Sequence, residues 1–393
     1  MLRRMQTNMV NSELQRGKDR AIPERIAVVA DDLTGACDSG VAFLTSGRTV
    51  RVVLDWSIFD PGMNRGLEVA GRPDVLAFTT ETRNLTQEQA SARVAEYMAS
   101  LKCTPGRCIL FKKIDSAARG HLGAETIAAL EGSGALLALV TPAFPAAERT
   151  VRSGILSVRD CSGQDARISL RDQFPSIDST QIDFLRAGPE VNLPLGIDRA
   201  IANGTRILIC DADTQEDLER LAEAGEQLRQ PVLWAGSAGL ARALAKALPV
   251  QQRKMGNPEG RFEGRTLLFV GTDHPVTSLQ IRHLEDHAGG LDCAIIRIDC
   301  GSTSRQEIGA AFSSEPVAAL ILTGGDTASL VLRSLDATSI LLAGEIAPGM
   351  PWGVVEGGAA HGCLVITKSG GFGDRDALLE ACEFSLRRSH EHA

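Results

Sequence analysis

Apolar strand-like runs, small polar loops and Ala/Leu-rich helical stretches alternate along most of this 393-residue chain. A β-branched strand, a Gly/Ser/Thr/Asp loop and a helix follow one another at residues 26–43, 109–130, 232–248, 267–284, 320–335 and 363–379. Such alternation is typical of parallel sheets whose strands are joined by right-handed helical crossovers. The pattern therefore predicts an α/β fold with mainly parallel sheets flanked by helices.

The alternation breaks most clearly at residues 249–264, where polar residues, two prolines and three glycines replace it. A chain of this length is long for one hydrophobic core and suits two domains. We predict a loose N-terminal extension at 1–24, a first domain at 25–248, a linker at 249–264 and a second domain at 265–393. A crevice between the two domains is the expected place for a ligand.

Composition narrows the class of protein. With 44% hydrophobic residues, 39 glycines and 4% aromatic residues, the chain fits a glycine-rich α/β enzyme. The formal net charge of −8 argues against nucleic acid or an anionic membrane as the main partner. The nine cysteines form no CxxC pair and mostly lie in apolar stretches, which favours free thiols. Because the chain also shows no secretory signal and no bilayer-length apolar run, we expect a soluble cytoplasmic protein.

Two adjacent carboxylates, Asp31 and Asp32, end the apolar run at residues 26–30. The carboxyl ends of parallel strands are where open α/β sheets bind their ligands. The small residues at 34–36 let a ligand approach the backbone, and the following helix offers free N–H groups to an anion. This segment therefore predicts a site for a polar, anionic small molecule.

Charged side chains also follow two other strands of the first domain. Arg83 lies in TETRNL after the apolar residues 75–78, and FKKIDSAARG carries Lys112, Lys113, Asp115 and Arg119. An arginine fork suits a substrate carboxylate, and a lysine suits a phosphoryl group. Mutual pairing, such as Asp115 with Arg119 at i,i+4 spacing, explains any one of these charges equally well. Three strands that all end in charge favour a shared site.

The second domain carries glycine-rich turns between strands and helices in place of charge clusters. They are VGTDHP at residues 270–275, TGGDTASL at 323–330 and ITKSGGFGD at 366–374. Such turns let a phosphate approach the backbone at a helix N-terminus, so together they predict a nucleotide cradle, although each alone is also compatible with simple packing. Neither a GxxxxGK[ST] loop nor a GxGxxG with an acidic residue at the expected distance is present, which excludes a P-loop protein and disfavours a dinucleotide dehydrogenase.

The ordered motifs ADDLTGACDSG, TETR, FKKIDSAARG, TPAFP, VGT, TGGDT, PGMPWG and TKSGGFGD resemble those of the four-carbon acid sugar kinase family. The resemblance covers residues 26–379. It implies that an N-terminal domain binds the sugar acid, that a C-terminal domain binds the nucleotide, and that ATP phosphorylates threonate, erythronate or 3-oxo-tetronate.

Transferred by motif, the resemblance places substrate contacts at Asp32, Arg83 and the segment 112–115, to which the charge pattern adds Asp31 and Arg119. The nucleotide contacts that it implies are Thr272, Gly324, Gly325, Asp326, Thr327, Gly349, Lys368, Gly370 and Gly371. Three features depart from the family pattern. Thr272 replaces a serine, SAARG replaces an STLRG-like run at Ala117 and Ala118, and the stretch between VGT and TGGDT is short. These departures leave the identity of the sugar acid open.

The resulting hypothesis is ATP-dependent phosphorylation of a hydroxyl, expected to be the 4-hydroxyl, of a tetronate-like acid. Asp32 is the expected base, with Asp115 as its rival, Arg83 holds the carboxylate and Lys113 stabilises charge at the transferred group. Mg²⁺ is expected to bridge the ATP phosphates. The expected partners are the sugar acid and ATP or ADP, with no nucleic acid and no membrane, and a homodimer is left open.

Two other classes of function remain compatible with the sequence. A non-catalytic sugar-acid sensor would use the first pocket and need no nucleotide. A lyase or isomerase acting on a phosphorylated sugar acid would use the glycine-rich loops for the substrate phosphate and would turn over without ATP.

Overall fold

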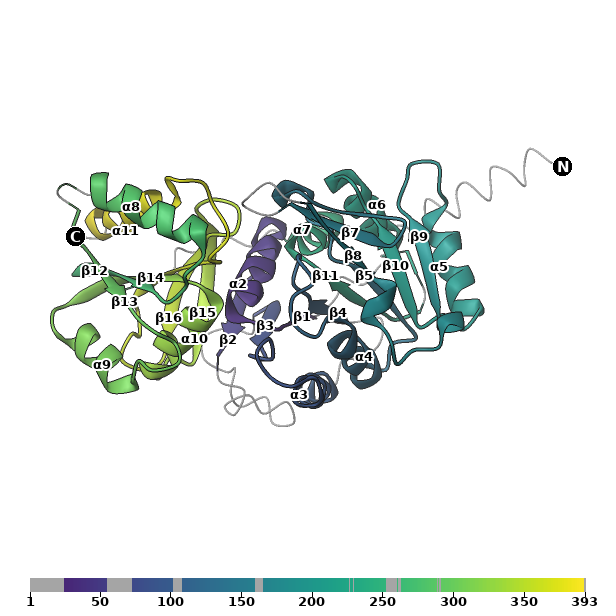
Figure 1. Ribbon diagram of the computed structural model, residues 1–393, viewed down its shortest axis with the longest axis horizontal. Coiled ribbons are helices and arrows are strands. Elements are labelled where there is room, and N and C mark those ends of the chain that lie inside the picture. Colours follow the sequence, from purple (N-terminus) through teal and green to yellow (C-terminus); the bar gives the residue numbers. More distant parts are fainter. Residues whose placement is uncertain are drawn as a thin grey trace.

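The computed structural model describes residues 25–54, 73–101, 108–159, 165–225, 227–228, 230–251, 260, 263–287, 289 and 291–391. The predicted N-terminal extension and most of the predicted linker lie outside the described residues. The remaining chain forms two α/β halves side by side, with the C-terminal half at the left and the N-terminal half at the right of Figure 1. The predicted fold class is confirmed.

The N-terminal half is built on parallel strands, most of which run through buried apolar residues. Continuous apolar runs of this kind are expected where helices cover both faces of a sheet. In order across the sheet the strands are β2 (Val50–Val53), β3 (Val75–Thr79), β1 (Arg25–Ala30), β4 (Cys108–Lys113), β11 (Val232–Gly236), β5 (Leu137–Thr141), β10 (Ile207–Asp211) and β9 (Ile182–Arg186).

Helices cover both faces of this sheet (Figure 1). They are α2 (Leu33–Val41), α3 (Gln87–Ser100), α4 (Leu122–Ser133), α5 (Leu193–Ala202), α6 (Gln215–Gly225) and α7 (Ala238–Ala247). Helix α3 packs against α4, and α6 packs against α7. A separate antiparallel sheet of β6 (Arg149–Arg152), β7 (Ile155–Arg159) and β8 (Asp165–Ser169) follows β5 in the chain.

The C-terminal half has a parallel group of strands and an antiparallel pair. In spatial order the strands are β13 (Cys293–Arg297), β12 (Arg265–Val270), β14 (Val317–Thr323), β17 (Leu364–Lys368), β16 (Pro351–Glu356) and β15 (Ser339–Glu345). The first four are parallel, and β16 and β15 run antiparallel to their neighbours. The helices of this half are α8 (Pro275–His287), α9 (Arg305–Ser313), α10 (Gly325–Ser334) and α11 (Ala377–Glu391).

Strands β2 and β15 join the two halves into one continuous sheet. They pair antiparallel, with Ser339 opposite Val53 and Leu341 opposite Arg51. The Arg51 guanidinium also holds the Glu356 carboxylate on β16, with nitrogen–oxygen distances of 2.7 and 2.9 Å. Each half thereby covers a strand edge that the other would leave unpaired.

Helix α2 lies between the two halves and contacts both (Figure 1). It packs against β3 and α7 of the N-terminal half and against α10, β15 and β17 of the C-terminal half. Its small residues allow this close packing: a Cβ atom built on Gly40 would lie 3.1 Å from Val50 Cγ1 and 3.3 Å from Leu342 Cδ1. The helix that begins after Asp32 is therefore a wall shared by both halves.

The cysteines only partly match the expected free thiols. Cys37, Cys210, Cys293, Cys300 and Cys382 are free thiols. Cys108 is disulfide-bonded, so the expectation is wrong at that position. Within the described part of the chain, no helix combines the length and the apolar character needed to span a bilayer.

Candidate active site

Asp32 occupies the N-cap of α2 at the carboxyl end of β1. Its Oδ1 accepts the backbone N–H of Gly35 at 2.8 Å, and its Oδ2 accepts the Thr34 hydroxyl at 2.9 Å. The extended backbone of Asp32, with φ −143° and ψ 163°, is usual for a helix N-cap. The Asp32 carboxylate, which is only 5% exposed, therefore has a fixed orientation.

Arg83 binds both aspartates from the segment after β3. Its Nε and Nη2 donate to Asp31 Oδ2 at 2.9 and 2.8 Å, and its Nη1 donates to Asp32 Oδ2 at 2.8 Å. Burial disfavours the charged guanidinium, but the carboxylates of Asp32, Asp31 and Asp115 outweigh it and raise the pKa of Arg83. Asp31 Oδ1 is buried and has no hydrogen-bond partner among the described residues. Arg83 thus fixes the carboxylates, and its contact with a substrate carboxylate stays a prediction.

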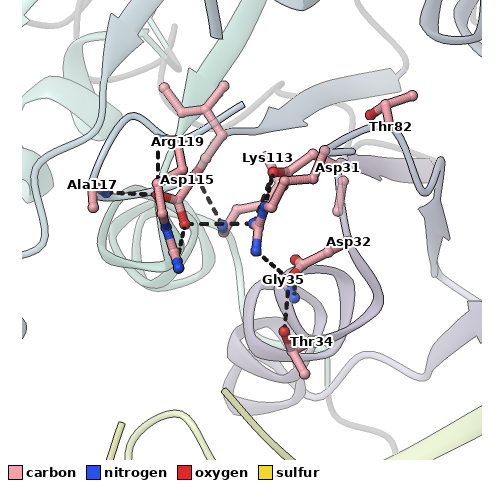
Figure 2. Close-up of polar contacts among 12 residues, drawn as sticks. Asp31, Asp32, Thr34, Gly35, Thr82, Lys113, Asp115, Ala117 and Arg119 are labelled. Atoms are coloured by element: carbon pink, nitrogen blue, oxygen red, sulfur yellow. Dashed lines mark hydrogen bonds and ion pairs between the residues drawn. The ribbon is translucent and has the colours of Figure 1, made fainter. Parts of the chain in front are cut away.

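Asp115 organises the turn after β4 (Figure 2). Its Oδ2 accepts the backbone N–H groups of Ala117 and Arg119 at 3.0 and 3.1 Å, and Arg119 Nη2 donates to Oδ1 at 2.7 Å. Burial alone would raise the pKa of Asp115, but Arg119, Arg83 and Lys113 hold it well below its ordinary value. A carboxylate stabilised this strongly is a poor proton acceptor, which weakens Asp115 as the rival base.

The two neighbouring lysines of β4 point to opposite faces of the sheet, as alternation along a strand requires. Lys113 lines the pocket with Asp32, and a Cβ atom built on Gly35 would lie 3.3 Å from Lys113 Nζ. Lys112 is completely buried and pairs with Glu125 of α4 at 2.7 Å. The structure therefore brings Lys113 to the site and places Lys112 away from it.

Three glycine-rich loops of the C-terminal half meet around Thr272. A Cβ atom built on Gly370 would lie 2.9 Å from Thr272 Oγ1, and one built on Gly324 would lie 3.5 Å from Thr272 Cβ. Gly324 has φ +102° and precedes α10 without a side-chain cap. The first turn of α10 thus leaves backbone N–H donors available to an anion.

The uncapped end of α10 lies directly against Asp32. A Cβ atom built on Gly325 would be 2.6 Å from Asp32 Oδ2, so a larger residue could not occupy this position without displacing the carboxylate. Beside it, Asn84 Nδ2 donates to Asp326 Oδ2 at 3.1 Å and joins the two halves. The predicted base and the predicted phosphate cradle are therefore neighbours, although they lie almost 300 residues apart in the sequence.

The other predicted nucleotide residues have different surroundings. Thr327 Oγ1 packs close to Gly271. Lys368 is fully buried, its Nζ donates to the carbonyls of Ser369 and Phe372 at 2.9 and 3.1 Å, and burial lowers its pKa to about 7. Gly349 donates its N–H to Glu345 Oε1 at 2.8 Å. Lys368 and Gly349 thus shape the loops around the site, and their contacts with a nucleotide stay predictions.

The site contains two adjoining cavities. The small pocket, of about 30 Å³, is lined by Asp32, Lys113, Asp115 and Arg119 of the N-terminal half and by Gly349, Ser369 and Phe372 of the C-terminal half. The large cleft, of about 720 Å³, lies between Arg119 and Arg149 on one side and His274 and Gly371 on the other. Both cavities are formed by the two halves together, as the predicted crevice requires.

Sequence reasoning missed a half-buried carboxyl in the TETR motif. Glu81 has a left-handed backbone with φ 51°, and its carboxyl accepts the Thr79 hydroxyl at 2.5 Å. Burial raises the pKa of Glu81, although hydrogen bonds from Thr79 and Ser329 oppose the shift. No local sequence signal marks this conformation, because left-handed backbone is uncommon for glutamate.

Sequence reasoning also missed a network of ion pairs that links the two halves. Arg242 of α7 binds Glu345 of β15 at 2.6 Å and Asp38 of α2 at 3.4 Å. Burial raises the pKa of Asp38 to about 6, opposed by Arg242 and Lys113. The three charges lie on segments far apart in the sequence, so their spacing carries no signal.

The donors at this site fit a magnesium nucleotide. Among the residues that the structure describes, no group of three or more His, Cys, Asp or Glu side chains could hold a metal ion. Mg²⁺ usually keeps several waters and needs only one or two carboxylates together with substrate phosphates. Asp32, which lies beside Gly325, and Asp326, in the first turn of α10, are carboxylates of that kind.

A pocket lined by charged side chains faces the glycine-lined N-terminus of α10 across a two-part α/β fold. Such an arrangement suits a protein that brings a polar small molecule to a phosphate. Residues 26–244 match the family model of a sugar-binding N-terminal domain, and residues 303–378 match that of a nucleotide-binding C-terminal domain. The chain therefore belongs to the four-carbon acid sugar kinase family, which confirms the resemblance seen in its motifs.

Individual relatives cover nearly the whole chain. A D-threonate kinase from Bordetella bronchiseptica is 30% identical, over 91% of this chain and 96% of its own length. A D-erythronate kinase from Heliobacterium modesticaldum is 26% identical, over 92% and 97%. A solved Haemophilus influenzae structure, with a TM-score of 0.61 and 19% identity over 92% of this chain and all of that one, supports the fold.

Proposed function

We propose that this chain transfers the terminal phosphoryl group of ATP to a hydroxyl, expected to be the 4-hydroxyl, of a four-carbon sugar acid. The relatives named D-threonate kinase and D-erythronate kinase support the class of reaction and of acceptor. The contact between Asp32 and Gly325 carries the proposal, because it places an oriented carboxylate beside a helix end suited to phosphate.

Asp32 has the geometry of the residue that receives the proton of the attacking hydroxyl. Thr34 and Arg83 donate to its Oδ2 and hold the carboxylate toward α10. Arg83 also keeps Asp31 beside it. Reorientation during the reaction is thereby limited, which is how positioned groups lower a barrier.

Charge at the transferred phosphoryl group would be stabilised from both halves. Lys113 supplies an ammonium beside the start of α2, and the first turn of α10 supplies backbone N–H groups. Arg119 lines both cavities and is placed to meet the sugar-acid carboxylate. Mg²⁺ bound with ATP would neutralise phosphate charge, and Asp32 and Asp326 at the start of α10 would be the carboxylates to hold it.

An ADP-release assay with a panel of sugar acids tests the proposal. The expected result is ATP-dependent ADP release with a four-carbon acid, and a product whose phosphate lies on the terminal carbon by NMR. Binding of the acid without ADP release would favour the non-catalytic sensor. Conversion of a phosphorylated acid without ATP would favour the lyase or isomerase.

A further inference from the structure

Two aromatic rings from opposite halves meet at the boundary between the small pocket and the large cleft. Phe144, in the turn after β5, stacks on Phe372, in the loop after β17, with ring centroids 6.0 Å apart and planes inclined by 30°. The Arg149 guanidinium lies 5.4 Å from the centre of the Phe372 ring. Both rings line both cavities, as do Arg119 and Ser369. The stack is therefore part of the wall that separates the two spaces.

The small pocket is too small for a sugar acid in this arrangement. Its volume is about 30 Å³, against about 720 Å³ for the large cleft. A cavity needs about 10 to 15 Å³ of such volume to hold one water, so the pocket has room for only about two or three waters. A four-carbon acid is several times larger. An acid that approaches Asp32 from the large cleft therefore needs the wall to move.

The two rings differ in burial. Phe144 is only 2% exposed, and its backbone exchanges two hydrogen bonds with Arg149, at 2.8 and 3.1 Å. Phe372 is half-buried, and its backbone carbonyl accepts hydrogen bonds from Gln280 and Lys368 at 3.0 and 3.1 Å. The loop backbone of Phe372 is therefore fixed, but its half-buried ring can turn away by a change of side-chain rotamer. The ring of Phe372 is thus the side of the stack that can move.

We propose that Phe372 determines which acid enters the small pocket, by leaving Phe144 to admit it and returning to exclude water and longer acids. The inference rests on the proposed function, since it concerns the same pocket and acceptor. With the ring displaced, the small pocket and the large cleft form one space. With the ring restored, water cannot replace the sugar hydroxyl as the phosphoryl acceptor.

Phe372→Ala in the full chain tests this role. Acceptor-free ADP release is expected to rise about tenfold, because water gains access to the phosphoryl group. The preference for a four-carbon over a five-carbon aldonic acid, measured as the ratio of kcat/KM values, is expected to fall about tenfold, the usual effect of one carbon in a tight pocket. Phe372→Leu, which keeps apolar bulk, should restore most of both properties.

Phe384→Ala is the matched control. Phe384 also stacks on an aromatic ring, that of Trp352 at 5.3 Å, and lies 5.5 Å from the Arg388 guanidinium, but it lines neither cavity. Its loss should leave the acid preference and the acceptor-free ADP release unchanged. Equal changes in the Phe384 and Phe372 variants would overturn the proposal, because they would indicate general loosening of this half.

Phe144→Ala approaches the same wall from the N-terminal half and leaves the Phe372 loop intact. It should relax the acid preference in the same direction, even if Phe372→Ala fails to fold. If the folded variants keep the acid preference and the acceptor-free ADP release of the wild type, the proposed role of the ring stack is wrong.

Calorimetric binding of four- and five-carbon acids measures the preference independently of turnover. A wild-type chain that binds acids selectively but releases no ADP would remove the proposed function alone.

Discussion

The two halves of the molecule contribute different kinds of groups to the site. The N-terminal half uses side chains: Arg83 holds Asp31 and Asp32, and Arg119 holds Asp115. The C-terminal half uses backbone, with glycine loops around Thr272 and an uncapped helix α10. Side chains can be matched to one acceptor, whereas backbone N–H groups suit any phosphate. Substitutions in the N-terminal half should therefore alter the charge and chemistry of the site, and substitutions in the C-terminal half should alter the space available to a ligand.

The largest expected effect is a loss of stability, and it tests whether Lys112 has a structural role and no role in the site. Lys112→Met should destabilise the protein by about 3 to 5 kcal/mol, because it leaves the Glu125 carboxylate buried without its partner. Chemical unfolding measures the loss. The double variant Lys112→Met/Glu125→Leu should recover most of it. A stable Lys112→Met protein with weakened acid binding would instead return Lys112 to the substrate site.

Asp32→Asn should lower turnover by roughly 10²-fold or more, the usual range for a lost general base. Asparagine is also a good N-cap, so α2 and the melting temperature should be little changed. ATP affinity, measured by calorimetry, should stay close to that of the wild type. Asp31→Asn is the neighbouring control and should be milder. Near-normal turnover in a stable Asp32→Asn protein would contradict the assignment of the base.

Gly325→Ala tests whether the C-terminal half contributes to the site by leaving room for Asp32. The added methyl group would meet Asp32 Oδ2 at 2.6 Å, so turnover should fall about tenfold through misplacement of the carboxylate. Gly309→Ala on α9 is the matched control, because a Cβ atom there meets nothing within 4 Å. It should leave turnover unchanged. Equal kinetics for the two variants would contradict a steric role for Gly325.

Asp115→Asn should have the smallest effect, a loss of about 1 to 2 kcal/mol from hydrogen bonds to the charged group. The pKa of Asp115 is lower in the folded chain than in the unfolded chain. The ionised carboxylate therefore contributes its full stability to the fold at a pH above the unfolded pKa, and this contribution is lost as the pH falls through the folded pKa. The stability difference between wild type and variant should therefore be constant near neutral pH and shrink in acid. Denaturant titrations at several pH values measure it. A turnover loss as large as that of Asp32→Asn would favour Asp115 as the base.

Much of the fold and of the site could be predicted from the sequence, because strand ends in a parallel sheet share one edge. That rule placed Asp32, Arg83 and Asp115 together, and the structure shows them in contact. It could not assign Lys112, since a strand buried on both faces gives no polar alternation to show which lysine faces the cleft.

Features that depend on pairing between distant segments were not predictable. The join between β2 and β15 links strands almost 300 residues apart, and nothing in either apolar run specifies its partner. Phe144 and Phe372 lie in motifs that the sequence highlighted, but a phenylalanine in a loop does not reveal that another will stack on it. Contacts of this kind arise only when the two halves are assembled.

The continuous sheet has a consequence for dividing the protein into fragments. A cut near residue 264 would strip β15 of the ladder that it shares with β2 and would uncover the face of α10 that packs on α2. The released fragment would expose the unpaired edge of β15, and an exposed strand edge can pair with another copy of the same fragment. A soluble nucleotide-binding fragment would therefore need a substitute for β2, such as a grafted strand or charged edge residues, before its affinity could be measured.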